Sequence, residues 1–201
     1  MLIYMTRHGE TEWNKAGRMQ GWKNSNLTEK GIRNARKLGE KLMDIQFDKI
    51  YCSPAGRARE TAEHILCGRK IDLEIKEDLK EMGFGVWEGM EFEVVREKYA
   101  DQHHKLWKSP HHYEPVEGET FGEVFTRVRQ VLKEIVEDGK ETVLIVTHAA
   151  ILKTIYAIVK GYSLEHFWSE PFMYDTNLSI LEYKDGAFSF ILEADTSHLM
   201  T

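Results

Sequence analysis

The sequence predicts an α/β fold, a three-layer α/β/α sandwich in which helices cover both faces of a mostly parallel sheet. Short apolar runs indicate buried strands, and amphipathic helical patterns lie between them, an alternation typical of this class. With 201 residues and 42% hydrophobic content, the chain is long enough for a sizeable core. We expect a single domain over residues 1–201. A polar stretch containing His and Pro interrupts the periodic segments, which predicts a small insertion near residues 90–120 that covers the functional site.

The first half of the chain contains two of the apolar strands. The first is Leu2–Met5. Thr28 can cap a helix over Glu29–Leu42, in which apolar residues recur at spacings of three and four. The second strand, Lys49–Cys52, is followed by a helical pattern over residues 55–66. The order strand, helix, strand, helix predicts parallel pairing.

The second half of the chain repeats this alternation of helices and strands and ends in a predicted β-hairpin. A long amphipathic helix is predicted over Phe121–Val136. The strand Thr142–Thr147 has a Val-Leu-Ile-Val core, which is typical of a parallel sheet covered on both faces, and the apolar helix Ala149–Val159 follows it. The tail returns to strand, with Leu178–Tyr183 and Phe188–Leu192 joined as a hairpin.

Charge and cysteine content exclude several classes of function. Thirty-three acidic residues against 27 basic residues give a net charge of −6, which argues against a general polyanion-binding surface, so no nucleic-acid partner is expected. Cys52 and Cys67 are too few for a disulfide framework. No stretch resembles a signal peptide, and no apolar run is long enough to span a bilayer. We therefore expect a cytoplasmic protein that does not act on membranes.

Charged and polar side chains follow each of the three apolar strands. Arg7 and His8 come after the first, residues 53–59 with Arg57 after the second, and His148 after the third. Ligands of open α/β sheets bind outside the carboxyl ends of the strands, so these residues are expected to converge. An unprotonated imidazole can attack phosphorus, and a guanidinium matches phosphate oxygens with a planar fork of donors. The set favours phosphoryl chemistry, although each position taken alone is also compatible with a structural role.

Motifs over most of the chain resemble those of the histidine phosphatase superfamily, also called the phosphoglycerate mutase-like family. In the first part they are Thr-Arg-His-Gly-Glu-Thr at residues 6–11 with Asn14, Gln20-Gly21, Leu27-Thr28 with Gly31, and Ser53-Pro54 leading to Arg57-Ala58 and Thr61-Ala62. In the second part they are Leu79-Lys80-Glu81, Gly85-Val86-Trp87-Glu88-Gly89, Gly118-Glu119-Thr120 and Val146-Thr147-His148. The resemblance implies a phosphoglycerate mutase-like fold. The run at residues 84–89 looks more like the small bacterial phosphatases, including broad-specificity and α-ribazole phosphate types, than like the glycolytic mutases.

The resemblance also implies the catalytic residues. His8 is the expected nucleophile, which becomes phosphohistidine, and Arg7, Arg57 and His148 are expected to hold the phosphoryl group. Glu81 is the expected proton donor. These roles agree with the chemistry, because phosphoryl transfer depends mostly on positioning and on stabilising the charge of three equatorial oxygens, which needs no metal here. A carboxyl near a phosphate dianion should also have a raised pKa and stay partly protonated near neutral pH.

Further positions are implied to bind the substrate. Asn14 and Gln20 would add phosphate or substrate contacts, together with Gly21. Relatives usually carry Gly after the second histidine, whereas this chain has Ala149, which is still small enough to leave its backbone N–H available to phosphate. No metal and no cofactor is implied.

Two features of the loops leave alternatives open. Glu88 is a local competitor of Glu81 for the role of proton donor, and only the family pattern separates them. Asn24 and Asn26 stand where many relatives have Asp and Pro before the Leu-Thr pair, so the shape of that loop is not predicted.

The expected insertion contains two pairs of histidines. They lack the carboxylate or Cys spacing of a zinc site, so solvated or lid positions are expected for His103-His104 and His111-His112. Aromatic residues in and after this region are candidates for lining a leaving-group pocket, although such residues more often simply pack. They are Trp107, Tyr113, Phe121 and Trp168.

We expect a metal-independent phosphomonoesterase that hydrolyses small phosphate esters through a covalent phosphohistidine on His8. Mutases of this type usually have a longer insertion after the proton-donor loop, whereas this chain has only residues 90–117 there, which favours hydrolysis. A cofactor-dependent phosphoglycerate mutase is the alternative, and a non-catalytic phospho-ligand binder is a weaker one. The expected partner is a small phosphorylated metabolite. Its identity stays open, as does the oligomeric state, for which a homodimer is one option.

Overall fold

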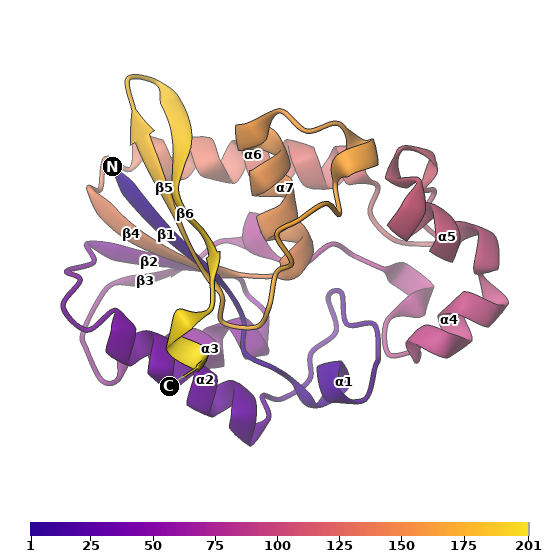
Figure 1. Cartoon of the computed structure of the whole chain (residues 1–201), viewed down its shortest axis with the longest axis horizontal. Coiled ribbons are helices and arrows are strands. Elements are labelled where there is room, and N and C mark those ends of the chain that lie inside the picture. The colour runs from indigo at the N-terminus through magenta and orange to yellow at the C-terminus, as the bar shows by residue number, and fades with distance from the viewer. Residues whose placement is uncertain (201) are drawn as a thin grey trace.

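The computed structural model describes residues 1–200. Within that range the chain forms a six-stranded mixed sheet in the order β3-β2-β4-β1-β5-β6. The strands are β1 (Leu2–Arg7), β2 (Lys49–Cys52), β3 (Leu73–Ile75), β4 (Thr142–Thr147), β5 (Leu178–Lys184) and β6 (Ala187–Asp195). The pairs β3-β2, β2-β4 and β4-β1 are parallel, whereas β5 is antiparallel to both β1 and β6. Figure 1 shows the strands as a twisted fan.

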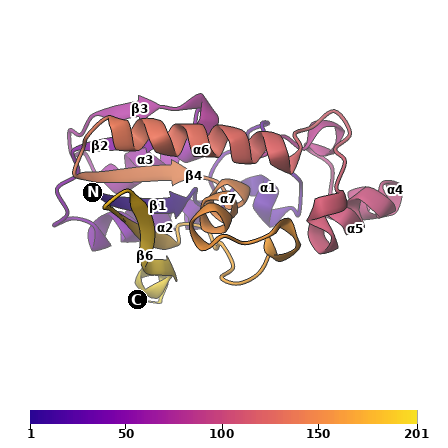
Figure 2. The same ribbon diagram turned by 90° about the horizontal axis from the view of Figure 1, so that it is seen from above.

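Helices cover both faces of this sheet. They are α1 (Glu12–Lys15), α2 (Glu29–Lys41), α3 (Gly56–Leu66), α4 (Phe92–Lys98), α5 (Ala100–Lys108), α6 (Phe121–Glu137) and α7 (Ala149–Lys160). Figures 1 and 2 show α2 and α3 on one side of the sheet and α6 and α7 on the other. The expected three-layer α/β/α arrangement is confirmed. In residues 1–200, no helix combines the length and apolar character needed to cross a membrane.

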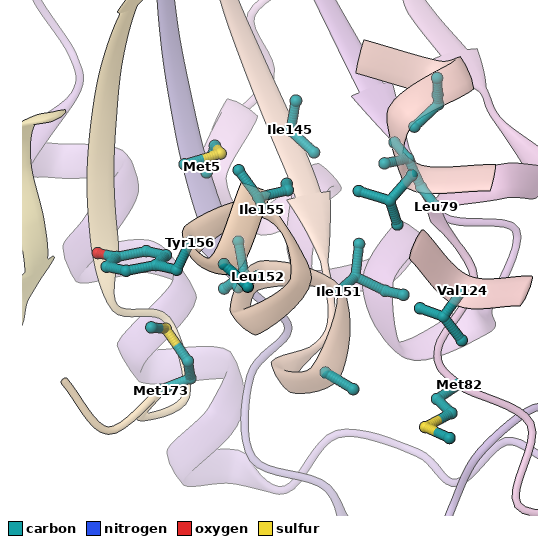
Figure 3. Close-up of a cluster of buried hydrophobic side chains, with 14 of the residues drawn as sticks. Met5, Leu79, Met82, Val124, Ile145, Ile151, Leu152, Ile155, Tyr156 and Met173 are labelled. Carbon is teal, nitrogen blue, oxygen red and sulfur yellow. The ribbon is translucent and has the colours of Figure 1, made fainter. Parts of the chain in front are cut away.

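The core lies on both sides of the sheet because side chains of each central strand alternate between its faces. Ile3 and Met5 of β1 join the cluster under α6 and α7, whereas Tyr4 joins the cluster under α2 and α3. Figure 3 shows part of the first cluster, in which Met5 and Ile145 lie near Ile155 of α7. Burying one such side chain contributes about 1.5–3 kcal/mol. This alternation therefore holds β1 in one register and places the residues that follow it.

The boundaries of the expected strands and helices agree with the structure to within a few residues. β1 runs on to Arg7, and α7 to Lys160. The sequence did not indicate β3, because a strand of three residues carries too little alternation. It also did not indicate α4 and α5 in the polar stretch, because each of them buries a single side chain, Val95 in α4 and Leu106 in α5.

Candidate active site

The parallel strands β1, β2 and β4 end at the same edge of the sheet. Their registers pair Arg7 with Thr147, the last residues of β1 and β4. The next residue, His8, donates its backbone N–H to the Thr147 carbonyl at 2.9 Å. Ser53, which follows β2, and His148, which follows β4, lie at the same edge, with a 2.7 Å hydrogen bond between Ser53 Oγ and His148 Nε2. The rings of His8 and His148 meet edge to face, 5.1 Å apart.

Two hydrogen bonds determine the tautomer of the buried His8 imidazole. Nδ1 lies 2.8 Å from the Gly9 carbonyl oxygen, which can only accept, so Nδ1 carries the proton. Nε2 lies 3.3 Å from Arg57 Nε–H, which can only donate, so Nε2 carries a lone pair. Both contacts require the same neutral form. His8 therefore presents an unprotonated Nε2.

The electrostatic surroundings keep both histidines neutral. Burial lowers the pKa of His8 well below its ordinary value of 6.5, and the Arg57 and Arg7 cations lower it further. Burial also lowers the pKa of His148 well below 6.5, with Arg57 the next contributor. The pocket therefore holds its positive charge on arginine, while the imidazoles stay available as a nucleophile and a hydrogen-bonding group.

Arg57 and Arg7 supply that positive charge. Arg57 is fixed by the Lys23 and Gly21 carbonyls, at 2.8 and 2.7 Å. Burial lowers the pKa of Arg57 to about 10, so the side chain stays protonated at neutral pH. Arg7 donates from Nη1 to the Met173 carbonyl at 2.9 Å. Its Nε is buried and has no hydrogen-bond partner among residues 1–200, which is unusual for a buried donor and suits an anionic ligand.

Glu81 is the buried carboxyl at this site. One oxygen accepts the Met82 N–H at 2.9 Å, and the other lies 3.5 Å from the N–H of Ala150 in the first turn of α7. Burial raises the pKa of Glu81, although the Met82 N–H and the Arg57 and Arg7 cations oppose this. A carboxyl with a raised pKa can donate a proton near neutral pH.

The catalytic candidates line a pocket of about 550 Å³, open solvent at its mouth included. Arg7, His8, Arg57 and Glu81 form its polar floor. Aromatic residues from α4, α5 and the segment after α7 form an apolar wall of the pocket. They are Phe92, Trp107 and Trp168. The pocket therefore joins a cationic centre to an apolar wall, which suits a phosphate attached to an organic group.

Comparison with known proteins identifies the family. A model of the histidine phosphatase superfamily (branch 1) matches residues 3–196. The chain belongs to the histidine phosphatase superfamily. It is similar to YhfR of Bacillus stearothermophilus, with a TM-score of 0.96 and 43% identity over 98% of both chains. It is also 35% identical to phosphoserine phosphatase 1 of Hydrogenobacter thermophilus, over 83% of this chain and 80% of that protein.

A second structural relative supports the phosphoglycerate mutase-like fold. Phosphoglycerate mutase of Bacillus anthracis is similar at a TM-score of 0.86 and 26% identity, over 100% of this chain and 95% of the mutase. The resemblance seen in the motifs is thus confirmed, and the chain is an enzyme of the histidine phosphatase type. The relatives differ in reaction, since their names include a phosphatase and a mutase.

The expected substrate-binding residues of this histidine phosphatase also line the pocket. They are Asn14, Gln20, Gly21 and Ala149. Gln20 is buried, and its Oε1 has no hydrogen-bond partner among the described residues. Gly21 has φ +57°, and a Cβ there would lie 2.1 Å from a Glu88 oxygen, so only glycine fits. Ala149 begins α7 without a positive φ, so the backbone here accepts Ala and does not require Gly.

His148 is placed differently from the other expected catalytic residues. It is fully buried beside His8 and is not among the residues that line the pocket. Its Nδ1 is buried and has no hydrogen-bond partner in the part of the chain that the structure describes. His148 therefore packs behind His8 rather than lining the pocket.

Glu88 and Asn24 have structural roles in the loops around the pocket. Glu88 accepts the backbone N–H groups of Trp22, Lys23 and Phe84 at 2.9–3.0 Å and is not among the pocket-lining residues. Asn24 accepts the backbone N–H of Arg57 at 3.0 Å, near the start of α3. The geometry therefore favours Glu81 over Glu88 as the acid.

The structure also locates the other histidines and aromatic residues. Among residues 1–200, no group of three or more His, Cys, Asp and Glu side chains is arranged to hold a metal ion, and this includes the histidine pairs of α5 and the turn after it. Trp107 and Trp168 line the pocket as expected, whereas Tyr113 and Phe121 are buried in the core. Sequence reasoning missed Arg18 and Phe92, which also line the pocket, because neither belongs to a motif or a periodic pattern.

Proposed function

We propose that this histidine phosphatase is a metal-independent phosphomonoesterase that works through a covalent phosphohistidine on His8. The observation that carries the proposal is the tautomer of His8, which puts a lone pair on Nε2 inside a pocket floored by two arginines. The Arg57 Nε contact with Nε2 is long, at 3.3 Å, so a phosphate oxygen can replace it at small cost. Nε2 would then face phosphorus.

Each step of the proposed reaction uses residues of the pocket. His8 Nε2 attacks phosphorus and forms the N–P bond as the P–O bond to the leaving group breaks, while Arg7 and Arg57 stabilise the equatorial oxygens. Glu81 gives its proton to the leaving oxygen. Water then attacks phosphorus and gives a proton to the Glu81 carboxylate, and the N–P bond breaks. Inorganic phosphate leaves, and Nε2 regains its lone pair.

The proposed substrate is a small phosphorylated metabolite. The cationic floor suits its phosphate, and the apolar wall of Phe92, Trp107 and Trp168 suits its leaving group. Hydrolysis is favoured over transfer because the insertion that holds α4 and α5 is short. Phosphoglycerate mutase is the second candidate, since a mutase is among the similar structures. The cytoplasm remains the expected location.

The test is a panel of phosphate esters assayed with the wild type, His8→Ala and Glu81→Gln. We expect His8→Ala to lose turnover on every ester and to give no phosphorylated protein on rapid acid-free quenching. Glu81→Gln should lower turnover of alkyl phosphates roughly 10²–10⁴-fold, because it removes the proton donor. Glu88→Gln is the matched control, a nearby buried carboxyl outside the pocket whose substitution should leave the relative rates across the panel unchanged.

Four results would contradict the proposal. Phosphate release by His8→Ala at the wild-type rate would exclude the nucleophile. Loss of activity in a chelator would show that a metal is required. Phosphate transfer between phosphoglycerates that needs a bisphosphate primer and exceeds phosphate release would identify a mutase, and binding without turnover of any ester would identify a phospho-ligand binder.

A further inference from the structure

A buried ion pair lies directly behind Glu81. Arg127 of α6 and Glu119, which precedes that helix, have side chains that are 10% and 12% exposed. They form two parallel hydrogen bonds, from Arg127 Nε to Glu119 Oε1 at 2.9 Å and from Nη2 to Oε2 at 2.8 Å. Neither residue lines the pocket. Glu119 belongs to a motif that the proposed reaction leaves without a role.

The other donors of Arg127 all bind the backbone that carries Glu81. Nη1 donates to the carbonyls of Asp78 and Lys80, each at 2.8 Å. Nη2 donates to the carbonyl of Glu81 itself at 3.1 Å. Together with the pair to Glu119, these contacts use all the N–H donors of a guanidinium. No other basic residue type has a planar fork of donors that could make these five hydrogen bonds.

Glu119 holds the far end of the same segment. Its Oε2 accepts the Gly83 N–H at 2.8 Å, and its backbone N–H donates to the Gly83 carbonyl at 2.8 Å. Between these contacts, the Leu79 carbonyl accepts a hydrogen bond from Thr147 Oγ1 at 2.7 Å. The segment from residue 80 to residue 84 forms neither helix nor strand, so it lacks regular backbone–backbone hydrogen bonds. Hydrogen bonds from these side chains satisfy its backbone groups instead.

We propose that the Arg127–Glu119 pair positions the Glu81 carboxyl for proton transfer to the leaving group. The inference rests on the proposed function. Among residues 1–200, the carboxyl oxygens accept hydrogen bonds only from the backbone N–H groups of Met82 and Ala150, so the backbone path of residues 78–83 sets where they lie. A misplacement of about 1 Å can lower a rate by about 10²-fold. A buried ion pair is also weak evidence for stability alone, because desolvation offsets much of its attraction.

If the Arg127–Glu119 pair positions Glu81, its loss should lower kcat/KM by an amount that depends on the leaving group. An alkyl phosphate releases an alkoxide that must be protonated, whereas 4-nitrophenyl phosphate releases a stable anion that needs no acid. Loss of Glu81 positioning should therefore lower kcat/KM for the alkyl ester and spare the nitrophenyl ester, because kcat/KM covers the steps up to phosphohistidine formation. A pair that only stabilises the fold would lower both values together.

The variants are Arg127→Lys and Glu119→Gln, assayed as the full chain with both esters. Lys keeps the charge but has three donors instead of five and no fork, so it should not substitute for Arg. We expect either variant to lower kcat/KM for the alkyl ester at least about tenfold and to change that for the nitrophenyl ester by less than about threefold. In a Glu81→Gln background, the same substitutions should have no further effect on the alkyl ester.

Lys49→Gln is the matched control. Lys49 is 12% exposed and pairs with Glu74 at 2.5 Å and Asp138 at 3.1 Å, whose side chains are 38% and 37% exposed, so its loss breaks ion pairs of a buried cation with half-exposed carboxylates. It lies at the start of β2, the end opposite the site. This control should change stability and leave the ratio of the two kcat/KM values at the wild-type level.

The outcomes separate this inference from the proposed function. Equal losses on both esters, or effects that add to those of Glu81→Gln, would overturn the positioning role while Glu81→Gln alone still discriminates between the esters. No discrimination by Glu81→Gln would overturn the proposed proton donor and the inference with it. Circular dichroism checks folding, and if Arg127→Lys does not fold, Glu119→Gln, which preserves the shape of the pair, decides the question.

Discussion

The chemistry of the pocket depends on which buried residues are charged. Arg7 and Arg57 carry the positive charge, whereas His8 stays neutral because burial and these two cations disfavour its protonated form. Glu81 is pushed in the opposite direction by burial, toward its protonated form. A neutral imidazole and a protonated carboxyl can therefore exist together in one pocket, which is the combination that the proposed phosphoryl transfer to His8 requires.

These pKa shifts predict the pH profile of kcat/KM. The acid limb belongs to protonation of His8, whose pKa is lowered, so it should lie below pH 6.5. The alkaline limb belongs to deprotonation of Glu81, whose pKa is raised, so it should lie above pH 4.5. Profiles of an alkyl ester, corrected for ionisation of the substrate itself, measure both limbs, and Glu81→Gln should remove the alkaline one. An acid limb above pH 6.5 would be inconsistent with the burial of His8.

Secondary-structure elements position these residues through their ends. Strands deliver His8 and His148, and the first turns of α3 and α7 present Arg57 and the backbone of Ala149 and Ala150. α6 contributes from its N-terminal half, where Arg127 lies two turns from the helix start. The orientation of α6 therefore matters to the site although the helix does not line the pocket.

The N-terminus of α6 gives a test at this scale. Thr120 and Glu123 form a capping box in which each side chain accepts the backbone N–H of the other residue. Thr120→Ala should lower the free energy of unfolding by about 1 kcal/mol, because it leaves the Glu123 N–H without its cap. Thr126→Ala on the exposed face of α6 is the control and should change it by less than about 0.5 kcal/mol. Urea denaturation measures both, and equal effects would contradict the cap.

At the scale of the whole molecule, the site exists because the parallel strands of one sheet end together. Arg7, Ser53 and His148 are far apart in the chain, yet the registers of β1, β2 and β4 place them at one edge. Packing on both faces of the sheet supplies the free energy that keeps the site in place. This free energy offsets the cost of burying the charged arginines and the neutral histidines of the site.

Burial of neutral histidines makes folding depend on pH. Both His8 and His148 have a lowered pKa when folded, so below their ordinary pKa of 6.5 the unfolded chain binds protons that the folded chain does not. Their stabilising contribution is full above pH 6.5 and falls as the pH drops, by up to about 1.4 kcal/mol per pH unit for each histidine. Glu81 has the opposite sign, since its raised pKa costs stability as the pH rises above 4.5. The pKa of each histidine is lowered well below its ordinary value, whereas the Met82 N–H and the Arg57 and Arg7 cations oppose the rise of the Glu81 pKa, so we expect a net loss of stability on acidification.

Urea denaturation at pH 7.5 and 5.5 measures this dependence. The wild type should be less stable at the lower pH, and His148→Gln should reduce the difference because one of the two histidines is gone. Equal losses in the wild type and in the variant would show that His148 does not contribute.

The sequence by itself determined the layered α/β fold, because apolar residues form short strand-like runs and recur at helical spacings along the chain. It also indicated His8, Arg57 and His148, since polar groups directly after buried strands meet at one sheet edge. The missing elements, β3 and the helices of the insertion, have too few buried residues to leave a pattern.

Tertiary structure alone decided how those residues work. The lone pair on His8 Nε2 faces Arg57, which lies 49 positions away in the chain. The choice of Glu81 over Glu88 depends on which carboxyl enters the pocket and which one binds loop amides. The contacts of Arg127 with the Glu81 segment span more than 40 residues. Hydrogen bonds between distant residues arise only when the packed core brings them together, so no local pattern in the chain could record them.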